Sequence, residues 1–515
     1  MGEKDKNIQE KAVSKEETKM LAFRSTVSVP FFSVHSLSRS IKGASKRLPQ
    51  DGFTFRGPES ESGAGKKKPN KFHMVEKEEK LKTFRHNIKH LKYRNSQHEV
   101  TVDNQHAIVR GAVMMLHDIP YETQLEMKQR KHKEILERLS GIKNVRPHIH
   151  KKFKDIIPSP ITVGYRNKDT MSVGLDVNGE LAVGFFASSK AVCVIPDSIS
   201  IIRDSHKHVA RVYTEFLTEQ VSRDNVSTYL GHGRGWSGEG WSEIMVRSNF
   251  KGELMVNVSY IVNESNRVRI EEEKKKLLEV FANSGLTIKT FYICEQSRVW
   301  GSKQYRLIQG DEFLKEQIGD VMMYLAPDTF CQGNTLVAER MVEVVRNKLE
   351  TGKRKTLMDL CCGSGMFSLA LAGDFRGAVG IDQTDTRVAG LNAELNGLTN
   401  TRYLTGSIQS HIVSITHDLR AVGATASAVL NPGRAGVTQN LIINLRRFQM
   451  LDSLIYISCQ PEDVRSFKNL QLLMSPDLIN TPAKFKSDPF RLVDSVPLDM
   501  FPQTHHCEHL FVLKR

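Results

Sequence analysis

A cysteine follows a short apolar segment in the sequence SLIYISCQPE. The apolar and β-branched run Leu454–Ile457 predicts a buried strand of a parallel sheet. Cys459 follows where this strand should end, because Pro461 cannot continue the hydrogen-bond ladder. In open α/β sheets this end of a strand faces the ligand crevice. Cys459 is therefore a candidate nucleophile, although a small apolar packing role is the alternative for an intracellular cysteine.

A glycine-containing turn follows an earlier apolar segment, in TLMDLCCGSGMF. Asp359, Gly363 and Gly365 lie at the end of the first predicted strand of an α/β region, where glycines let the backbone approach a ligand. A dinucleotide fingerprint would need a third glycine where Ser368 stands, which argues against a nicotinamide cofactor. The methyltransferase fold that binds S-adenosylmethionine uses such a short turn, with an acid after the second strand that accepts hydrogen bonds from the ribose. Asp382 in VGID is that acid, and a purely structural turn is the alternative.

The fourth predicted strand ends in AVLNPGRAG. Asn431 and Pro432 stand where methyltransferases that act on bases have an Asn/Asp-Pro turn for the substrate, and Arg434 adds a candidate contact to a phosphate or a base. An Asn-Pro dipeptide is also an ordinary turn signal. The substrate interpretation therefore depends on the neighbouring motifs.

A carboxylate accompanies the thiol near the end of the sequence, where Glu508 precedes the last predicted strand. A thiol and a carboxylate beside a methyl donor suit methylation of uracil at C5. A thiolate that adds to C6 makes C5 nucleophilic, and a base afterwards removes the C5 proton. We assign Cys459 as the nucleophile and Glu508 as the base. The segment HHCEH at 505–509 lacks the spacing of a closed zinc site, so no metal is expected.

The composition indicates a globular protein with a polyanionic partner. The chain has 515 residues, and 73 lysines and arginines exceed 58 aspartates and glutamates to give a net charge of +15. This surplus favours nucleic acid as the partner, while a basic protein with a disordered tail is the alternative. The seven cysteines form no CxxC pair, which argues against a disulfide framework or a zinc ribbon. No apolar run reaches the roughly 18 residues of a membrane span.

Three regions follow from the pattern along the chain. Residues 1–105 predict a disordered basic tail. Within it, residues 20–50 contain five basic residues, seven serines and no acid, as in a mitochondrial transit peptide. This stretch begins at the internal Met20, so a basic tail is the alternative. We expect a mitochondrial protein, with the cytosol or the nucleus as alternatives.

Residues 106–324 predict a helical lead-in and an α+β, β-rich domain. A helix is expected over 120–140, between Pro120 and Gly141. A second helix is expected over 268–283, with its charged residues on its surface. The predicted strands are TMSVGL, LAVGFF, SEIMVRS and ELMVNVSYI, with a hairpin turn at Asn249–Gly252 between the last two.

Residues 325–515 predict alternating strands and helices, and hence a parallel α/β sheet. The expected helix is TLVAERMVEVVRNKLE, and the expected strands are TLMDLC, AVGID, TRYLTG, ASAVLNP, SLIYISC and HLFVLKR.

The motifs together resemble those of the RNA uracil-5-methyltransferase family, from about residue 106 onward. IIPSPITVGYRNK resembles the family's entry into its RNA-facing domain, and PDTFCQGNT contains its Phe-x-Gln-x-Asn motif. DLCCGSG is similar to its cofactor turn, SCQP to its nucleophile motif Ser-Cys-Asn-Pro, and FPQTHHCE to the terminal motif that carries the base. The sequence resembles most the eukaryotic members of mitochondrial type, which methylate the T-loop uridine of tRNA.

The resemblance implies a class I S-adenosylmethionine-dependent, Rossmann-like domain after an RNA-binding domain, and a monomer. It implies RNA, most commonly tRNA, as the substrate, with ribosomal RNA as an alternative. The residues implied at the cofactor are Gln332, Cys361, Gly363, Met366, Asp382 and Asn431, and those implied at the RNA are Phe330, Arg434, Tyr165 and Arg166. Further candidates on the RNA-facing domain are Lys168, Arg234 and Trp236.

Departures from the family's motifs leave other functions open. Asn431 stands for the usual aspartate and Gly433 for a proline, Asp382 replaces a glutamate, and Cys361 and Met366 replace more polar or aromatic residues. An amide in place of a carboxylate adds a hydrogen-bond donor and removes a charge. One alternative is an RNA-binding or chaperone protein that has lost turnover. Another is an amino-group methyltransferase, which would need no cysteine.

Overall fold

The computed structural model describes the residues 99–141, 154–187, 192–221, 240–261, 267–296, 303–434, 436–475 and 487–515. These residues belong to one compact unit of the chain, Glu79–Arg515. The transit-like stretch 20–50 and the candidates Arg234 and Trp236 lie outside the described residues. Within the described ranges no helix has the length and apolar character that a membrane crossing requires.

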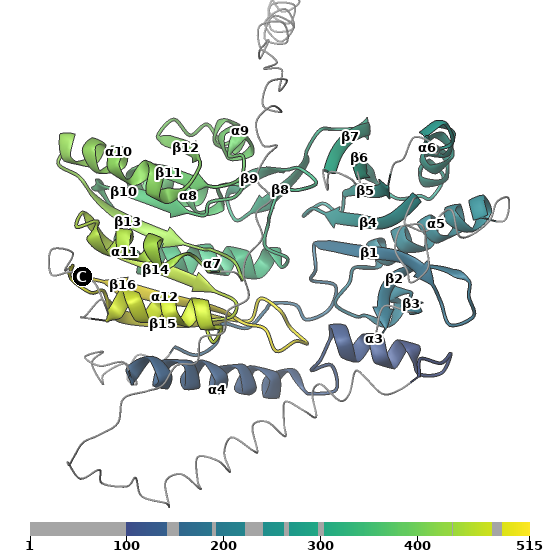
Figure 1. The fold of residues 1–515 in the computed structure, drawn as a ribbon, viewed down its shortest axis with the longest axis horizontal. Coiled ribbons are helices and arrows are strands. Elements are labelled where there is room, and N and C mark those ends of the chain that lie inside the picture. Colours follow the sequence, from purple (N-terminus) through teal and green to yellow (C-terminus); the bar gives the residue numbers. More distant parts are fainter. Residues whose placement is uncertain are drawn as a thin grey trace, which may run out of the picture. The chain divides into compact units, whose positions relative to one another are not determined.

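A mixed sheet in the order β12-β11-β10-β13-β14-β16-β15 forms the centre of the region after residue 350 (Figure 1). β10 to β14 are parallel to one another, whereas β16 is antiparallel to β14 and β15. The predicted Rossmann-like α/β fold is therefore confirmed. The strands are β10 (Gly352–Leu360), β11 (Phe375–Asp382), β12 (Thr401–Thr405), β13 (Thr425–Leu430), β14 (Leu451–Ser458), β15 (Arg491–Leu498) and β16 (Glu508–Lys514).

Helices cover both faces of this sheet, and the strands supply alternate residues to each face. On β14, Leu454 and Tyr456 pack in the cluster of α10, α11 and α12, whereas Ile455 and Ile457 pack in the cluster of α7 and α8. The apolar run that predicted this strand is thus buried on both sides. The helices are α7 (Thr335–Lys348), α8 (Met366–Leu371), η4 (Ala372–Asp374), α9 (Arg387–Leu395), α10 (Ile408–Ala421), α11 (Gln439–Arg447) and α12 (Val464–Met474).

A second sheet, in the order β3-β2-β1-β4-β5-β6-β7, forms the β-rich region. Its core consists mainly of side chains from the sheet and from α5 and α6, with Tyr213 and Phe216 around Trp241. The predicted hairpin turn joins β4 to β5. The elements are β1 (Lys168–Leu175), β2 (Leu181–Ala187), β3 (Val192–Val194), η2 (Pro196–Ser198), α5 (Asp204–Val221), β4 (Gly240–Ser248), β5 (Leu254–Ile261), α6 (Arg267–Ala282), β6 (Ile288–Gln296) and β7 (Lys303–Gly310).

The charged residues of α6 differ from the prediction in part. Glu273 and Lys274 are buried, at 3% and 6% exposure, although a solvated surface was expected for both. Glu273 accepts a hydrogen bond from Trp241 Nε1 at 3.0 Å, and the ammonium of Lys274 lies 2.7 Å from Glu271. Each charge is therefore buried together with a polar partner, which compensates its loss of water.

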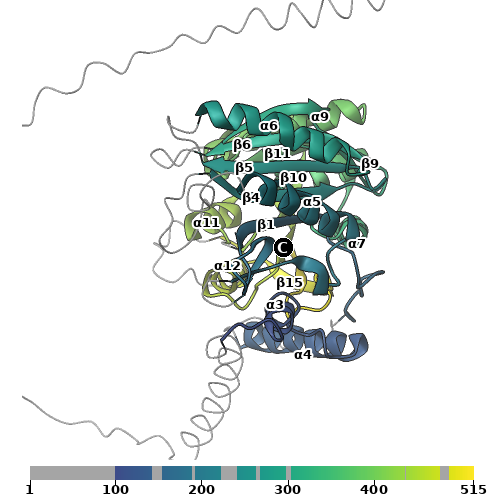
Figure 2. The same ribbon diagram turned by 90° about the vertical axis from the view of Figure 1, so that its right-hand side faces the viewer.

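Three further elements join these sheets. α3 (Gln105–Val113) packs on β2 and β3, and the ribbon of β8 (Leu314–Ile318) and β9 (Val321–Leu325) packs against α7 and α9. α4 (Tyr121–Ser140) confirms the predicted helix and lies along the β15 side of the α/β sheet in both views (Figures 1 and 2). The expected boundary at residue 324 falls inside β9, and the division into domains stays a prediction.

Candidate active site

The carboxyl ends of the parallel strands bring most of the predicted site residues to one edge of the α/β sheet. β10 leads into the turn at Cys361–Gly365, β11 ends at Asp382, β13 is followed by Asn431, and β14 is followed by Cys459. Parallel strands present their carboxyl ends on the same side. Residues between Cys361 and Cys459 in the sequence therefore come together at one crevice.

The antiparallel last strand brings Glu508 to the same edge. Ser458 on β14 pairs with His509 on β16. In an antiparallel pair, one residue forward on one strand lies opposite one residue back on the other. The position after Ser458 therefore sets Cys459 opposite Glu508. The predicted nucleophile and base are thus neighbours across two adjacent strands.

Burial and charge set the protonation of this pair. Glu508 is 5% exposed, and burial raises its pKa to about 7, against the opposing effect of the Arg434 charge. The pKa of the Cys459 thiol is raised to about 11 by burial and by the charge of Glu508, against the opposing effect of the Arg434 charge. The thiol is protonated at neutral pH, and Arg434 is the nearby cation that favours ionisation of both groups.

The turn after β10 has the backbone shape of a ligand-binding turn. Cys361, Gly363 and Gly365 all have positive φ angles, of 63°, 52° and 89°. A side chain at Gly365 would lie 3.1 Å from the Tyr403 hydroxyl, so this position tolerates only glycine well. No atom lies within 4 Å of the place where a side chain of Gly363 would begin. The turn therefore leaves open space directly beside its backbone.

Two carboxylates hold this turn. Asp382 Oδ2 accepts a hydrogen bond from the Gly363 amide at 2.9 Å. Asp359 Oδ2 accepts one from the Ser368 amide at 2.9 Å, which fixes the start of α8. The other Asp359 oxygen is buried and has no hydrogen-bond partner among the described residues, and burial raises the pKa of this carboxyl to about 6. An adenosylmethionine fits this turn, with its open space and the carboxylate of Asp382 at the adjacent strand end.

A loop before α7 borders the turn. Phe330 is 65% exposed, and its carbonyl accepts a hydrogen bond from Ser364 Oγ at 3.2 Å. Gln332 is buried, and its carbonyl accepts one from Asn167 Nδ2 at 2.8 Å. The loop thus connects the β-rich region to the turn, and it presents an aromatic ring to solvent beside the site.

Asn431, Arg434 and Met366 occupy the expected positions around the turn. The Asn431 amide nitrogen of the backbone donates to Leu360 at 3.2 Å, while the described residues offer its side chain no hydrogen-bond partner in this structure. Arg434 is exposed, and Met366 is the first residue of α8. The side chains of Asn431 and Arg434 are therefore available to a ligand.

The structure corrects the prediction for Tyr165. Its side chain is 2% exposed and packs in the apolar cluster of α3, β2 and β3, and its hydroxyl donates to the Pro502 carbonyl at 3.1 Å. It is a core residue, so it does not face RNA. Arg166 is partly exposed, but its Nε lies 2.6 Å from the buried Asp169, which indicates a structural role as well.

A basic pocket includes Arg434, whose charge also acts on the Cys459 thiol. It has a volume of about 540 Å³ and is lined by Arg434, Gln439, Asp463, Val464, Arg465, Lys468 and Asn469. Asn469 is fully buried, and its Oδ1 has no hydrogen-bond partner in the described part of the chain. Sequence reasoning missed this pocket because α12 offers only an ordinary amphipathic pattern.

The described residues contain no group of three side chains arranged to hold a metal ion. In the HHCEH segment, Cys507 Sγ lies 3.1 Å from the Leu498 carbonyl and His509 Nδ1 lies 2.8 Å from His132 Nδ1. These side chains are therefore engaged in packing contacts.

Comparison with known proteins gives consistent matches. Residues 241–515 match the family model described as tRNA (Uracil-5-)-methyltransferase. The chain is 30% identical to tRNA (uracil-5-)-methyltransferase homolog B of Homo sapiens, over 77% of this chain and 82% of that protein. It is 27% identical to homolog A of Homo sapiens, over 79% of this chain and 67% of that protein.

The fold is also similar to that of solved structures, of which one example follows. It is the Pyrococcus abyssi tRNA (uracil-54, C5)-methyltransferase in complex with S-adenosyl-L-homocysteine, with a TM-score of 0.55 and 22% identity over 77% of this chain and 84% of that one.

Proposed function

The chain belongs to the tRNA (uracil-5-)-methyltransferase family, and on that premise we propose that it forms 5-methyluridine at the T-loop uridine of tRNA by a covalent mechanism. Membership makes it an RNA methyltransferase that uses S-adenosylmethionine. The observation that carries the proposal is the strand register that sets Cys459 opposite Glu508, because this chemistry needs a nucleophile and a base at one ring.

Cys459 starts the reaction by addition to the uracil ring. Its thiolate forms a bond to C6, and the electron pair of the C5–C6 double bond moves to C5. S-Adenosylmethionine, when bound, supplies the methyl group to C5 and keeps the electron pair of the bond that breaks. Glu508 then takes the C5 proton, the double bond forms again, and the thiolate leaves C6.

The protonation states suit these two roles. A carboxyl with a pKa of about 7 is ionised in about half of the molecules at neutral pH, and it can take and release a proton in each turnover. The thiol, with a pKa of about 11, has to lose its proton when the ring binds. Arg434 supports that step, since its positive charge stabilises the thiolate.

The residues of the turn hold the donor. Asp382 is the acceptor for the ribose hydroxyls, and the open space beside Gly363 receives the donor against the backbone. Gln332, Cys361, Met366 and Asn431 would line the donor site. The free Asn431 amide is able to bind either the donor or the uracil.

Two features near the thiol and the net charge of the chain support RNA as the substrate. The exposed Phe330 ring suits stacking on a base that has been extruded from the loop. Arg434, Arg465 and Lys468 line the basic pocket, which suits the phosphates beside the target nucleotide. The chain as a whole carries a net charge of +15.

The covalent mechanism is tested with radiolabelled methyl donor and unmodified tRNA. The wild type should label the T-loop uridine, and Cys459→Ala should abolish the label. Cys193→Ala, which changes a buried cysteine of the other sheet, is the matched control and should keep full activity. Label that survives in Cys459→Ala would eliminate the nucleophile assignment. If ribosomal RNA is labelled in a parallel reaction and tRNA is not, ribosomal RNA is the substrate.

A second candidate function rests on Asn431. An amide at the position of a substrate-binding aspartate favours a protein that binds RNA without turnover. Tight tRNA binding by purified protein that binds the donor but transfers no methyl group would establish this alternative.

We further propose a mitochondrial monomer. Support for the compartment is the acid-free basic stretch 20–50. Fusion of residues 1–105 to a fluorescent protein tests it, since cytosolic or nuclear fluorescence would contradict it. Sedimentation of the purified protein measures its oligomeric state.

A further inference from the structure

We propose, on the premise of the proposed function, that Gln124 of α4 is a positioning residue for the base. It lies outside the α/β sheet and holds the loop 499–507, which leads directly into Glu508. The motifs that identify the site give no indication of such a role, because Gln124 lies 379 residues before its partner Gln503 in the sequence.

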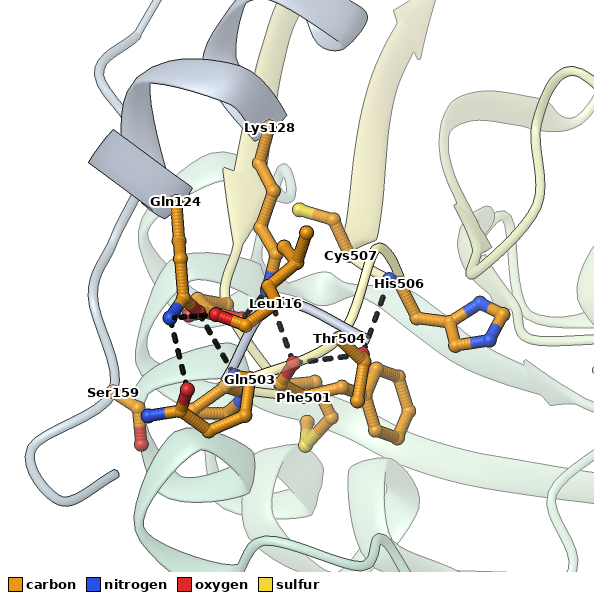
Figure 3. A network of polar contacts seen from close by, with 12 residues as sticks. Leu116, Gln124, Lys128, Ser159, Phe501, Gln503, Thr504, His506 and Cys507 are labelled. Atoms are coloured by element: carbon orange, nitrogen blue, oxygen red, sulfur yellow. Dashed lines mark hydrogen bonds and ion pairs between the residues drawn. The ribbon is translucent and has the colours of Figure 1, made fainter. Parts of the chain in front are cut away.

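Gln124 and Gln503 bind each other through reciprocal hydrogen bonds (Figure 3). Gln124 Nε2 donates to Gln503 Oε1 at 2.9 Å, and the Gln503 backbone amide donates to Gln124 Oε1 at 2.9 Å. The Gln503 carbonyl accepts from the Leu116 amide at 2.9 Å. Gln124 is fully buried, so removal of its side chain leaves the Gln503 amide without its protein acceptor.

The backbone of Gln503 needs this support. Its φ angle is 68°, in the left-handed region that residues other than glycine seldom adopt. A backbone in this region persists only where neighbouring groups hold it. Loss of Gln124 removes the acceptor for the Gln503 amide, and we expect the loop to relax toward negative φ. Such a change redirects the chain five residues before Glu508.

α4 contacts the same segment at further points on one helical face. Lys128 Nζ lies 2.5 Å from Asp499 Oδ1 and donates to the Phe501 carbonyl at 3.0 Å. Tyr121 donates to Asp499 Oδ2 at 2.9 Å. His132 lies against His509, the residue after the base, with 2.8 Å between their Nδ1 atoms. Residues 121, 124, 128 and 132 are spaced by three or four, so one face of the helix holds the segment on both sides of Glu508.

The position of Glu508 limits the last step. Cys459 adds to the ring and C5 takes the methyl group before the base acts, and the C5 proton then leaves to Glu508. The charge of Glu508 raises the pKa of the Cys459 thiol, so a displaced carboxylate does not slow the first step, whereas it slows the last one. The methylated RNA should remain bonded to Cys459, and this covalent adduct survives denaturing electrophoresis.

The test compares Gln124→Ala with the wild type and with Gln129→Ala. Gln129 is on the same helix and donates to the Lys154 carbonyl at 3.1 Å, so it matches the change in type and location. With labelled donor and tRNA, Gln124→Ala should release 5-methyluridine about tenfold more slowly, with labelled protein–RNA adduct accumulating and the KM for tRNA unchanged. Gln129→Ala should behave as the wild type.

A rescue variant separates positioning from general damage. Gln503→Gly in the Gln124→Ala background should restore part of the release rate, because glycine adopts the left-handed conformation without support. If Gln124→Ala does not fold, Gln124→Met replaces it, since methionine has a similar size and lacks both the acceptor for the Gln503 amide and the amide donor.

Three results would overturn the proposal: release at the wild-type rate, a higher KM without adduct, or no rescue by glycine. A wild type that yields neither 5-methyluridine nor adduct contradicts the proposed function itself, which distinguishes the two failures.

Discussion

Two buried carboxylates in this protein have opposite surroundings. Asp169 of the β-rich region is 1% exposed, with Arg166 Nε at 2.6 Å and His206 Nδ1 at 2.7 Å. Glu508 of the α/β region is 5% exposed, and the described residues provide no hydrogen bond to its carboxylate. Burial alone would raise both pKa values, yet the partners of Asp169 lower its pKa, whereas the pKa of Glu508 rises to about 7.

The difference separates a structural carboxylate from a reactive one. A carboxylate with two close cationic or hydrogen-bonding partners stays ionised and fixes the elements that carry these partners. A buried carboxylate with a cation nearby but no hydrogen-bond partner among the described residues exchanges its proton near neutral pH. A buried carboxylate thus indicates a reactive group only where it lacks close hydrogen-bonding or cationic partners.

Replacement of the reactive carboxylate should have the largest effect. Glu508→Gln should lower the formation of 5-methyluridine by about 10³-fold, and the covalent adduct with Cys459 should accumulate. Quantification of adduct and product after a single turnover measures both. Glu350→Gln, a partly exposed glutamate at the opposite end of the sheet, is the control. Loss of product without any adduct would instead assign Glu508 a role before methyl transfer.

Replacement of the structural carboxylate should act on stability. Asp169→Ala leaves His206 and Arg166 without their shared partner, so the free energy of unfolding should fall by about 3 kcal/mol. Urea denaturation measures the change, and Glu508→Gln should show no such loss because it removes an uncompensated buried charge. The folded pKa of Asp169 is lowered, so its contribution is present above the ordinary value near 4 and is lost as the pH falls below it. An equal loss of unfolding free energy in Asp169→Ala and Glu508→Gln would contradict the distinction between a structural and a reactive carboxylate.

The pH dependence should sharpen the comparison. Proton removal needs ionised Glu508, so the rate at which a preformed adduct resolves should rise with pH around a midpoint near 7. The cation of Arg434 lowers this pKa, and Arg434→Ala should therefore move the midpoint to higher pH. The adduct-resolution rate is the right measurement, because it excludes ionisation of the thiol. A midpoint that stays or falls contradicts the electrostatic role of Arg434.

Two aromatic rings should give the smallest effects. Phe330→Ala removes an exposed ring and should raise the KM for tRNA about tenfold, the equivalent of one lost stacking contact, with little change in stability. Tyr165→Phe removes only the hydroxyl that donates to Pro502, so it should lower stability by about 1 kcal/mol and leave the KM unchanged. A higher KM for tRNA in Tyr165→Phe would instead support an RNA contact of Tyr165, which its burial contradicts.

The sequence pattern predicts the parallel core of the fold but not its edges. The apolar run Leu454–Ile457 is recognisable because both faces of β14 are buried. β15 contains Asp494, Ser495 and Pro497 and lies at the end of the sheet. Ser495 is buried there because its hydroxyl forms a hydrogen bond with His132 of α4, a partner that a local sequence pattern does not reveal. β7 has the sequence KQYRLIQG and is largely exposed, so it carries no hydrophobic alternation for a sequence pattern to detect.

The sequence likewise predicts only some of the site residues. Cys459 and Asp382 are predictable because each follows a recognisable strand. Tyr165 was wrongly expected at the surface, since a tyrosine near arginine and lysine has the composition of an RNA-binding face, and only the tertiary structure reveals the Pro502 carbonyl above it. Gln124 has no local signal, because its partner lies in a loop more than three hundred residues away.

The contacts of α4 join parts of the chain that are synthesised at very different times. Lys128 precedes Asp499 by 371 residues, so the ribosome makes the helix long before the segment that it holds. Throughout that interval Ile135, Leu136 and Leu139 lack the strand β16 with which they share an apolar cluster. Contacts at such separation form late in folding. We therefore expect the segment that carries the proposed base Glu508 to be fixed late in folding.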